Sequence, residues 1–196
     1  EDASTEPDIH PVFVGSDAER LLDLVVTEET IRDKLKRLRD DKAAGVDDLS
    51  PRFLGSISDQ IVEPILILVR KSLDEGRVHE DWRDANVVPI FKKGSRGKPD
   101  DYRPVSLTSQ ICKIIESVIM DAIVNHLEKH QLIRDSQHEF RAGRSCLTNL
   151  LVFFEKVSES IDKGESIDVI YTDFAKAFDK VPHQRLLKKL QGHGIG

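Results

Sequence analysis

Residues 167–183 have the sequence Ile-Asp-Val-Ile-Tyr-Thr-Asp-Phe-Ala-Lys-Ala-Phe-Asp-Lys-Val-Pro-His. The β-branched and aromatic run 169–171 predicts a buried strand, with Asp173 at its end and Pro182 in the first turn of a following helix. A carboxylate fixed at a strand end suits a hard divalent cation and the phosphates that it carries. A surface acid that merely ends a strand fits the same residues, so this segment alone leaves both interpretations open.

The composition is typical of a globular protein: 196 residues, 39% hydrophobic and 33% charged, fit one domain or a domain with a tail. No apolar run reaches the roughly 20 residues that cross a bilayer, and the acidic N-terminus is not a signal peptide. We therefore expect an intracellular protein without a membrane partner. The missing initiator Met indicates a fragment or a processed chain. Cys112 and Cys146 lie in predicted helices, which favours reduced core thiols, and no Cys or His spacing resembles a zinc site.

Charge is distributed unevenly along the chain. The net charge is −6, but residues 1–30 alone carry −8, which leaves +2 for residues 31–196. Within residues 82–113, seven bases face three acids. An acidic leader on a locally basic body is compatible with a polyanionic partner, although a solvated basic face has the same composition.

Hydrophobic periodicity predicts an α+β fold. Residues 1–26 lack a period and are interpreted as an acidic leader or linker without fixed order. Helices are expected at 27–45, 58–75, 109–130, 145–163 and 182–191. Thr27 is the expected N-cap of the first, and residues 61, 65, 68 and 69 form the expected inward face of the second. Short strands are expected at 87–91 and 104–108, joined by a hairpin loop. The strand before Asp173 has no visible partner, so we expect residues outside this chain to complete its sheet.

The loop from Lys92 to Arg103 has the chemistry of a phosphate grip. Two adjacent lysines and glycines at 94 and 97 precede an arginine that enters a strand. Arginine supplies bidentate contacts to phosphate oxygens and lysine a mobile point charge. A basic hairpin tip kept soluble by its charges is the alternative interpretation.

Taken together, five blocks resemble reverse transcriptases of non-long-terminal-repeat (LINE-type, jockey-like) retrotransposons. The blocks occur in the family's order, and the resemblance runs from about residue 28 to the end. They are KAAGVDDLSP at 42–51, WRDANVVPIFKKG at 82–94, DYRPVSLTS at 101–109, QHEFRAGRSCLTN at 137–149 and DVIYTDFAKAFDKVPH at 168–183. The resemblance implies helical fingers with a β-hairpin, followed by the start of a right-hand polymerase palm. Residues 27–196 would then form a partial reverse transcriptase domain.

The same resemblance implies roles around Asp173. This residue matches the first metal-binding aspartate of the palm, and the backbone carbonyl of Phe174 would be a second ligand of the same ion. The intact polymerase uses two Mg²⁺ ions, with Mn²⁺ as a substitute, to transfer a nucleotide to a primer 3′-hydroxyl. Phe178 falls where the family places the aromatic gate against a ribose 2′-hydroxyl. Asp179 is expected to cap the helix that begins at Pro182, with a place near the nucleotide as the alternative.

Upstream blocks imply contacts to nucleotide and nucleic acid. Lys92 or Lys93, together with Arg103, matches finger residues that hold the incoming deoxynucleotide triphosphate. The implied partners of the intact protein are an RNA template, a DNA primer and these triphosphates. Residues that match a block near the template and primer are Gln137, Phe140, Arg141 and Arg144.

Several positions depart from the family pattern. Glu139 replaces a usual glycine, Val46 and Asp48 replace a proline and a glycine, and Thr172 replaces an aliphatic residue, which indicates a divergent element or a decayed copy. The later block with two further metal-binding aspartates is missing, so we do not expect this chain to polymerise by itself. Its enzymatic status is therefore left open. A non-catalytic nucleic-acid-binding remnant, or a pseudogene product, is the alternative to a polymerase fragment.

Overall fold

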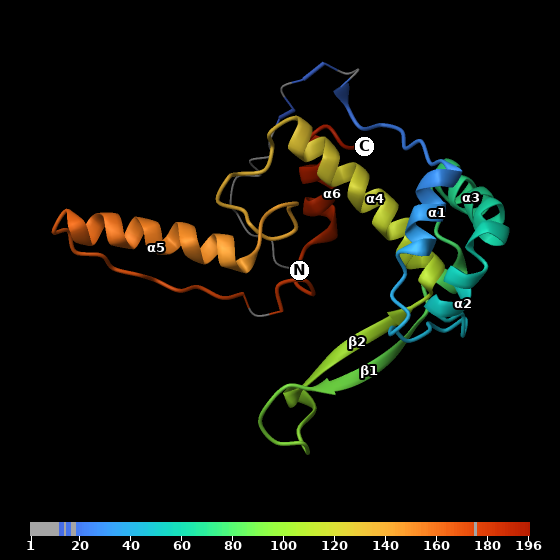
Figure 1. Ribbon diagram of the computed structural model, residues 1–196, viewed down its shortest axis with the longest axis horizontal. Coiled ribbons are helices and arrows are strands. Elements are labelled where there is room, and N and C mark those ends of the chain that lie inside the picture. The colour runs from blue at the N-terminus through green and yellow to red at the C-terminus, as the bar shows by residue number, and fades with distance from the viewer. Residues whose placement is uncertain (1–11, 14, 17–18, 175) are drawn as a thin grey trace. The chain divides into compact units, whose positions relative to one another are not determined.

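The computed structural model describes residues 12–13, 15–16, 19–174 and 176–196. The elements of these residues are α1 (Glu28–Lys36), α2 (Pro51–Ser56), α3 (Ser58–Asp74), η2 (Glu80–Trp82), β1 (Ala85–Phe91), η3 (Pro99–Asp101), β2 (Tyr102–Thr108), α4 (Gln110–Lys129), α5 (Cys146–Asp162) and α6 (His183–Gly192). They form two compact units, one of residues 23–122 and one of residues 123–196 together with the described residues before 23. The expected α+β class is confirmed (Figure 1).

Local sequence signals set the helix starts in the first unit. The Thr27 hydroxyl accepts a hydrogen bond from the Thr30 N–H at 3.2 Å, so the expected N-cap of α1 is confirmed. Ser50 caps α2 in the same way, with Pro51 in its first turn. The first helix ends at Lys36, well before the expected residue 45. The expectation was wrong because Arg37 already has the C-cap conformation, and the Leu38 N–H bonds the Leu35 carbonyl three positions back instead of continuing the helical pattern.

The core of the first unit lies between α1, α3 and the first half of α4. Its buried members are Val26, Ile31, Leu35, Leu54, Val62, Ile65, Leu66, Val69, Ile114, Ile115 and Val118. Leu68 was expected to face inward but is 43% exposed. Apolar residues lie on two adjacent faces of helix α3. The face that carries Val62 and Leu66 packs into the core against α1, whereas Leu68 lies outside that face. The Arg70 guanidinium also binds the Val26 carbonyl at 2.8 Å, which fixes the chain that enters α1.

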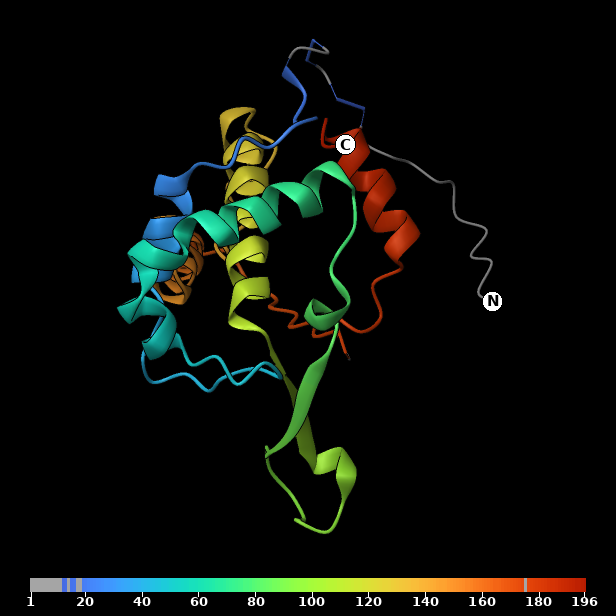
Figure 2. The same cartoon turned by 90° about the vertical axis from the view of Figure 1, so that its right-hand side faces the viewer.

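Strands β1 and β2 form an antiparallel hairpin that extends away from helices α1–α3 (Figures 1 and 2). The register pairs Ala85 with Thr108 at one end and Phe91 with Tyr102 at the other. Both expected strands are therefore confirmed, each slightly longer than the sequence predicted. At the base of the hairpin, the Gln110 side-chain amide donates to the Ala43 carbonyl at 2.8 Å, which ties the loop before α2 to the start of α4.

Gly45 makes the closest backbone approach in this region. A Cβ atom there would overlap the Thr108 carbonyl and lie 2.7 Å from the Ser109 nitrogen. We expect Gly45→Ala to lower the free energy of unfolding by about 1–3 kcal/mol, because backbone atoms must move to admit the methyl group. Urea unfolding followed by circular dichroism measures this loss. Gly97→Ala is the matched control, because a Cβ atom at Gly97 meets only the Ser95 hydroxyl at 3.8 Å. Equal unfolding free energies for the two variants would contradict the close approach.

The second unit contains α5, α6 and the last turns of α4. Residues Leu21 and Ile195 form an isolated parallel bridge, and the Phe13 ring lies 5.7 Å from the His126 ring and 5.4 Å from the His130 ring. Helix α5 has the expected bounds and begins with a capping box between Ser145 and Thr148. Its apolar side chains are solvent-exposed, including Leu147, Leu150, Leu151 and Phe154.

Residues 165–174 form no strand in the structure, so the prediction of a buried strand there is wrong for this chain. Ile170 is 86% exposed and Tyr171 84% exposed. A strand needs a neighbour for its backbone N–H and C=O groups. Within the described residues the only strand ladder is the β1–β2 hairpin, so this apolar segment has no neighbour to pair with. Among the residues that the structure describes, no helix is long and apolar enough to cross a bilayer.

Candidate functional site

The loop between β1 and β2 is folded by its own hydrogen bonds. The Lys92 N–H donates to the Asp101 carbonyl at 2.8 Å, and the Asp101 carboxylate accepts from the Ser95 N–H at 2.6 Å. The Tyr102 hydroxyl donates to the Arg96 carbonyl at 2.9 Å. These contacts fix the path of the basic loop, so its cations project from a defined backbone.

The backbone pairing of the hairpin extends as far as Lys92, and Lys93 lies in the bend that follows. Ile90 pairs with Arg103, and the ladder continues to Lys92 opposite Asp101. Side chains alternate between the faces of a strand, so Lys92 and Arg103 share one face of the hairpin. Phe91 and Tyr102 lie on the opposite face, with their rings 5.5 Å apart.

A third cation is held on that opposite face. The Arg96 guanidinium lies 5.3 Å from the centre of the Phe91 ring, close enough for a cation–π contact. The hairpin therefore presents two cations together, Lys92 and Arg103, on a face that Arg96 does not share. Both side chains are solvent-exposed and available to an anion.

Asp173, Phe174 and Phe178 lie in the exposed segment before α6. The Phe174 side chain is 82% exposed and that of Phe178 83%. Among residues 12–13, 15–16, 19–174 and 176–196, no group of three or more His, Cys, Asp or Glu side chains is placed to hold a metal ion. The Asp173 carboxylate and the Phe174 carbonyl are oxygen donors of the right kind for a hard cation, which takes about six oxygen ligands. These donors do not form a metal site by themselves.

Asp179 does not cap the last helix. Helix α6 has Pro182 at its N-cap position and no side-chain cap hydrogen bond, so the expected cap is wrong. A capping side chain belongs to the N-cap residue itself, and Asp179 lies three positions earlier in a turn.

The loop between α4 and α5 holds the four residues predicted to lie near template and primer. Arg141 forms a two-pronged ion pair with Glu128 of α4, at 2.8 Å from Nε to Oε1 and 2.9 Å from Nη2 to Oε2. Its Nη1 also donates to the Arg134 carbonyl at 3.1 Å. The Arg141 guanidinium lowers the pKa of the Glu128 carboxyl below its usual range. Gln137 donates to the Glu139 carbonyl at 3.2 Å, and Phe140 is 77% exposed.

His138 is a residue that the sequence did not single out. Its side chain is 4% exposed, and Nδ1 lies 2.8 Å from the Thr148 hydroxyl in the first turn of α5. Thr148 also takes part in the capping box of that helix. A histidine flanked by exposed residues gives no periodic signal, so only the structure reveals this contact.

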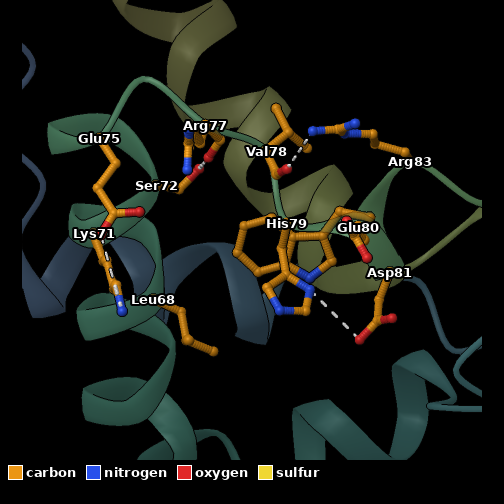
Figure 3. Close-up of a pocket in the computed structure, with 11 residues that line it drawn as sticks. Leu68, Lys71, Ser72, Glu75, Arg77, Val78, His79, Glu80, Asp81 and Arg83 are labelled. Carbon is orange, nitrogen blue, oxygen red and sulfur yellow. Dashed lines mark hydrogen bonds and ion pairs between the residues drawn. The ribbon is translucent and has the colours of Figure 1, made fainter.

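A pocket lined by residues between positions 68 and 83 was also not predicted. It has a volume of about 630 Å³ and lies between the end of α3 and η2 (Figure 3). The His79 and Trp82 rings lie 5.8 Å apart, and His79 Nδ1 is 3.5 Å from an Asp81 carboxylate oxygen. Figure 3 shows Lys71 and Glu75 on the helical side of the pocket.

The two cysteines differ sharply in environment. Cys112 is buried, and burial together with the nearby Glu116 carboxylate raises the pKa of its thiol to about 11, whereas Cys146 is exposed. The expectation of two core thiols is therefore wrong for Cys146, because α5 contributes no buried residue to a core. We expect a thiol reagent at pH 8 to label Cys146 rapidly. Only about one Cys112 in a thousand is then a thiolate, so Cys112 should react only after denaturation. Mass spectrometry of tryptic peptides distinguishes the sites, and equal labelling in the folded protein would contradict this packing.

Comparison with known proteins places the basic hairpin and the Asp173 segment in one family. The family described as reverse transcriptase (RNA-dependent DNA polymerase) matches residues 90–196, more than half of the chain. The RNA-directed DNA polymerase from mobile element jockey of Drosophila melanogaster is 28% identical over 165 residues, which are 84% of this chain and 18% of that protein.

Other relatives cover similar lengths. The probable RNA-directed DNA polymerase from transposon BS of Drosophila melanogaster is 24% identical over 83% of this chain and 18% of its own length. The transposon TX1 uncharacterized 149 kDa protein of Xenopus laevis is 26% identical over 95% of this chain and 14% of its own length. The chain thus spans less than a fifth of these relatives, and the expected resemblance to jockey-like elements is confirmed. The chain belongs to the reverse transcriptase (RNA-dependent DNA polymerase) family.

Proposed function

We propose that the chain forms the nucleotide-receiving part of an RNA-directed DNA polymerase of a retrotransposon. The family match over residues 90–196 carries this proposal, because the match includes both the basic hairpin loop and Asp173. In this proposal residues 27–196 are a partial domain, with helices and hairpin as fingers and the Asp173 segment as the start of the palm. Residues 1–26 are a leader or linker.

In this proposal the hairpin binds the phosphates of the incoming deoxynucleotide triphosphate through two residues. Lys92 and Arg103 share one face of the hairpin, whereas the next lysine, Lys93, lies in the bend that follows the strand. Arginine contacts two phosphate oxygens at once, and lysine adds a single point charge. The pair therefore neutralises the triphosphate and orients its α-phosphate for attack by the primer 3′-hydroxyl, with pyrophosphate as the leaving group.

Asp173 would contribute one carboxylate, and Phe174 one carbonyl, to the Mg²⁺ site of the complete polymerase, in which Mn²⁺ could substitute. The cation supplies charge neutralisation at the reacting phosphate. Phe178 would pack against the sugar and reject a ribose 2′-hydroxyl. In this proposal the remaining ligands are the two aspartates of the family's later block, since the described residues bring no three such side chains together.

Binding of a template–primer duplex tests the proposal at the level of this chain. We expect the 196-residue protein to bind an RNA–DNA duplex with an affinity that falls steeply with salt, because lysines and arginines release counterions from the phosphates. Fluorescence anisotropy across a salt series measures the slope. No binding, or binding insensitive to salt, would overturn the nucleic-acid role.

A further inference from the structure

A second pocket lies within the second unit, between the end of α4 and helix α6. Its volume is about 1030 Å³, which matches the largest pockets in which proteins bind small molecules, of about 1,000 Å³. One wall consists of residues from the last turn of α4 and the turn that follows, and the other of residues from α6 and His193. The contacts proposed above for nucleotide and metal do not involve this pocket.

Hydrogen bonds hold the two walls of the pocket together. His126 Nε2 donates to the His193 carbonyl at 2.8 Å, and His193 Nδ1 donates to the Lys189 carbonyl at 2.7 Å. The turn after α4 is closed by the Leu132 N–H, which donates to the Leu127 carbonyl at 2.8 Å. The walls are therefore fixed before a ligand binds, which lowers the entropy cost of binding.

The lining of the pocket combines an aliphatic surface with positive charge. Arg134 adds a guanidinium from the turn, and Lys189 adds an ammonium group from α6. No Asp or Glu occurs among the described residues that line the pocket. A ligand that complements this surface has an apolar body and a negative charge. The aliphatic side chains come from both walls: Leu127, Leu132, Ile133, Leu186 and Leu190.

The acid next to Arg134 in sequence does not line the pocket. The Asp135 side chain is 96% exposed, and its carboxylate lies 3.9 Å from Arg141 Nη1 and 3.9 Å from Arg144 Nη2. Within the described parts of the chain, neither Arg134 nor Lys189 forms an ion pair with a carboxylate. Both cations therefore stay available to an anion in the pocket.

We propose that this pocket binds an amphiphilic monocarboxylate, whose aliphatic chain packs on the leucines and whose carboxylate pairs with Arg134 and Lys189. Arginine binds a carboxylate through two parallel hydrogen bonds, and lysine adds a point charge. Burial of the aliphatic chain provides affinity, and the two cations select an anion over a neutral amphiphile. This site does not depend on the polymerase function proposed above.

Isothermal titration calorimetry with octanoate, below its micelle concentration, tests the selection of an anion. We expect the 196-residue protein to bind a single octanoate molecule, and to bind octanol at least about tenfold more weakly, because the neutral alcohol forms no ion pair. Replacing both cations, by Arg134→Gln with Lys189→Gln, should weaken octanoate binding about tenfold and octanol binding by less than about twofold. No binding of octanoate, or equal affinity for octanoate and octanol, would overturn the site.

A pair of neighbouring leucines tests whether the ligand lies in this pocket. Leu186 and Leu187 both belong to α6 and are 43% and 52% exposed, but only Leu186 lines the pocket. Leu186→Asp should weaken octanoate binding at least about tenfold, because its carboxylate repels that of the ligand, whereas Leu187→Asp should keep the parental Kd within about twofold. Circular dichroism checks that both variants fold. Equal losses in the two variants would overturn the assignment.

Two further measurements separate the pocket from other apolar surfaces. Phe154→Ser removes an exposed aromatic ring from α5 and should leave the Kd for octanoate unchanged. The chain completed with the C-terminal part of the jockey relative should bind octanoate as the 196-residue protein does. A weaker Kd in Phe154→Ser would place the ligand on α5, and loss of binding in the completed chain would assign the pocket to the polymerase's own residues. Either result would overturn the proposal.

Discussion

We expect Asp173→Asn to lower the rate of RNA-templated primer extension by about a thousandfold or more when the chain is completed with the C-terminal part of the jockey relative. The reason is chemical. An amide keeps the size of the side chain but lacks the anionic oxygen that a hard divalent cation prefers. Asp173 is solvent-exposed, so the substitution should leave folding unchanged. Affinity for the template–primer duplex should stay within about twofold of the parent, because in the proposed site this carboxylate binds the metal ion and not the duplex.

Asp168→Asn is the matched control for this prediction. Asp168 lies in the same exposed segment, five positions upstream, and has no proposed role. Its variant should extend primers at the parental rate. If the Asp168 and Asp173 variants behave alike, whether both active or both inactive, the assignment of Asp173 is wrong.

The second large effect is expected for the KM when Lys92 or Arg103 of the hairpin is removed. We expect Lys92→Ala and Arg103→Ala each to raise the KM for deoxynucleotide triphosphates about tenfold or more in the completed polymerase, since each loses a charge-assisted contact to phosphate. Steady-state extension at varied triphosphate concentration measures this change. Because both residues lie on one face, the double variant should lose less than the product of the single losses.

Lys93→Ala and Arg96→Ala provide the controls within the same loop. Both remove one positive charge from the same loop, and Arg96 is already engaged with the Phe91 ring. A KM that rises equally in all four variants would show that the loop acts only through its net charge. The shared face of Lys92 and Arg103 would then carry no function.

Local signals made much of the first unit predictable from the sequence. The hairpin has its two strands and glycine-containing turn residues within a short span, and the N-cap at Thr27 depends on one residue. The strand expected before Asp173 shows the limit of such signals. Its composition favours a strand, but the neighbour that would satisfy its backbone is not among the described residues, so Ile170 and Tyr171 remain exposed.

The candidate site also combines features that the sequence predicts with features that only the structure reveals. Basic residues of the hairpin loop could be predicted by residue type, whereas the shared face of Lys92 and Arg103 required the strand register. The pairing of Arg141 with Glu128 could not be predicted, because it joins a loop to the end of a helix 13 positions away. Its two hydrogen bonds depend on how α4 ends, and no short-range pattern encodes that geometry.

Primer extension on an RNA template, by this chain completed with the C-terminal part of the jockey relative, tests the central claim most directly. The account predicts incorporation of deoxynucleotides that requires a divalent cation, is lost in Asp173→Asn and survives in Asp168→Asn. A folded protein that binds the template–primer duplex but adds no nucleotide, or one that extends equally well without the Asp173 carboxylate, would contradict it.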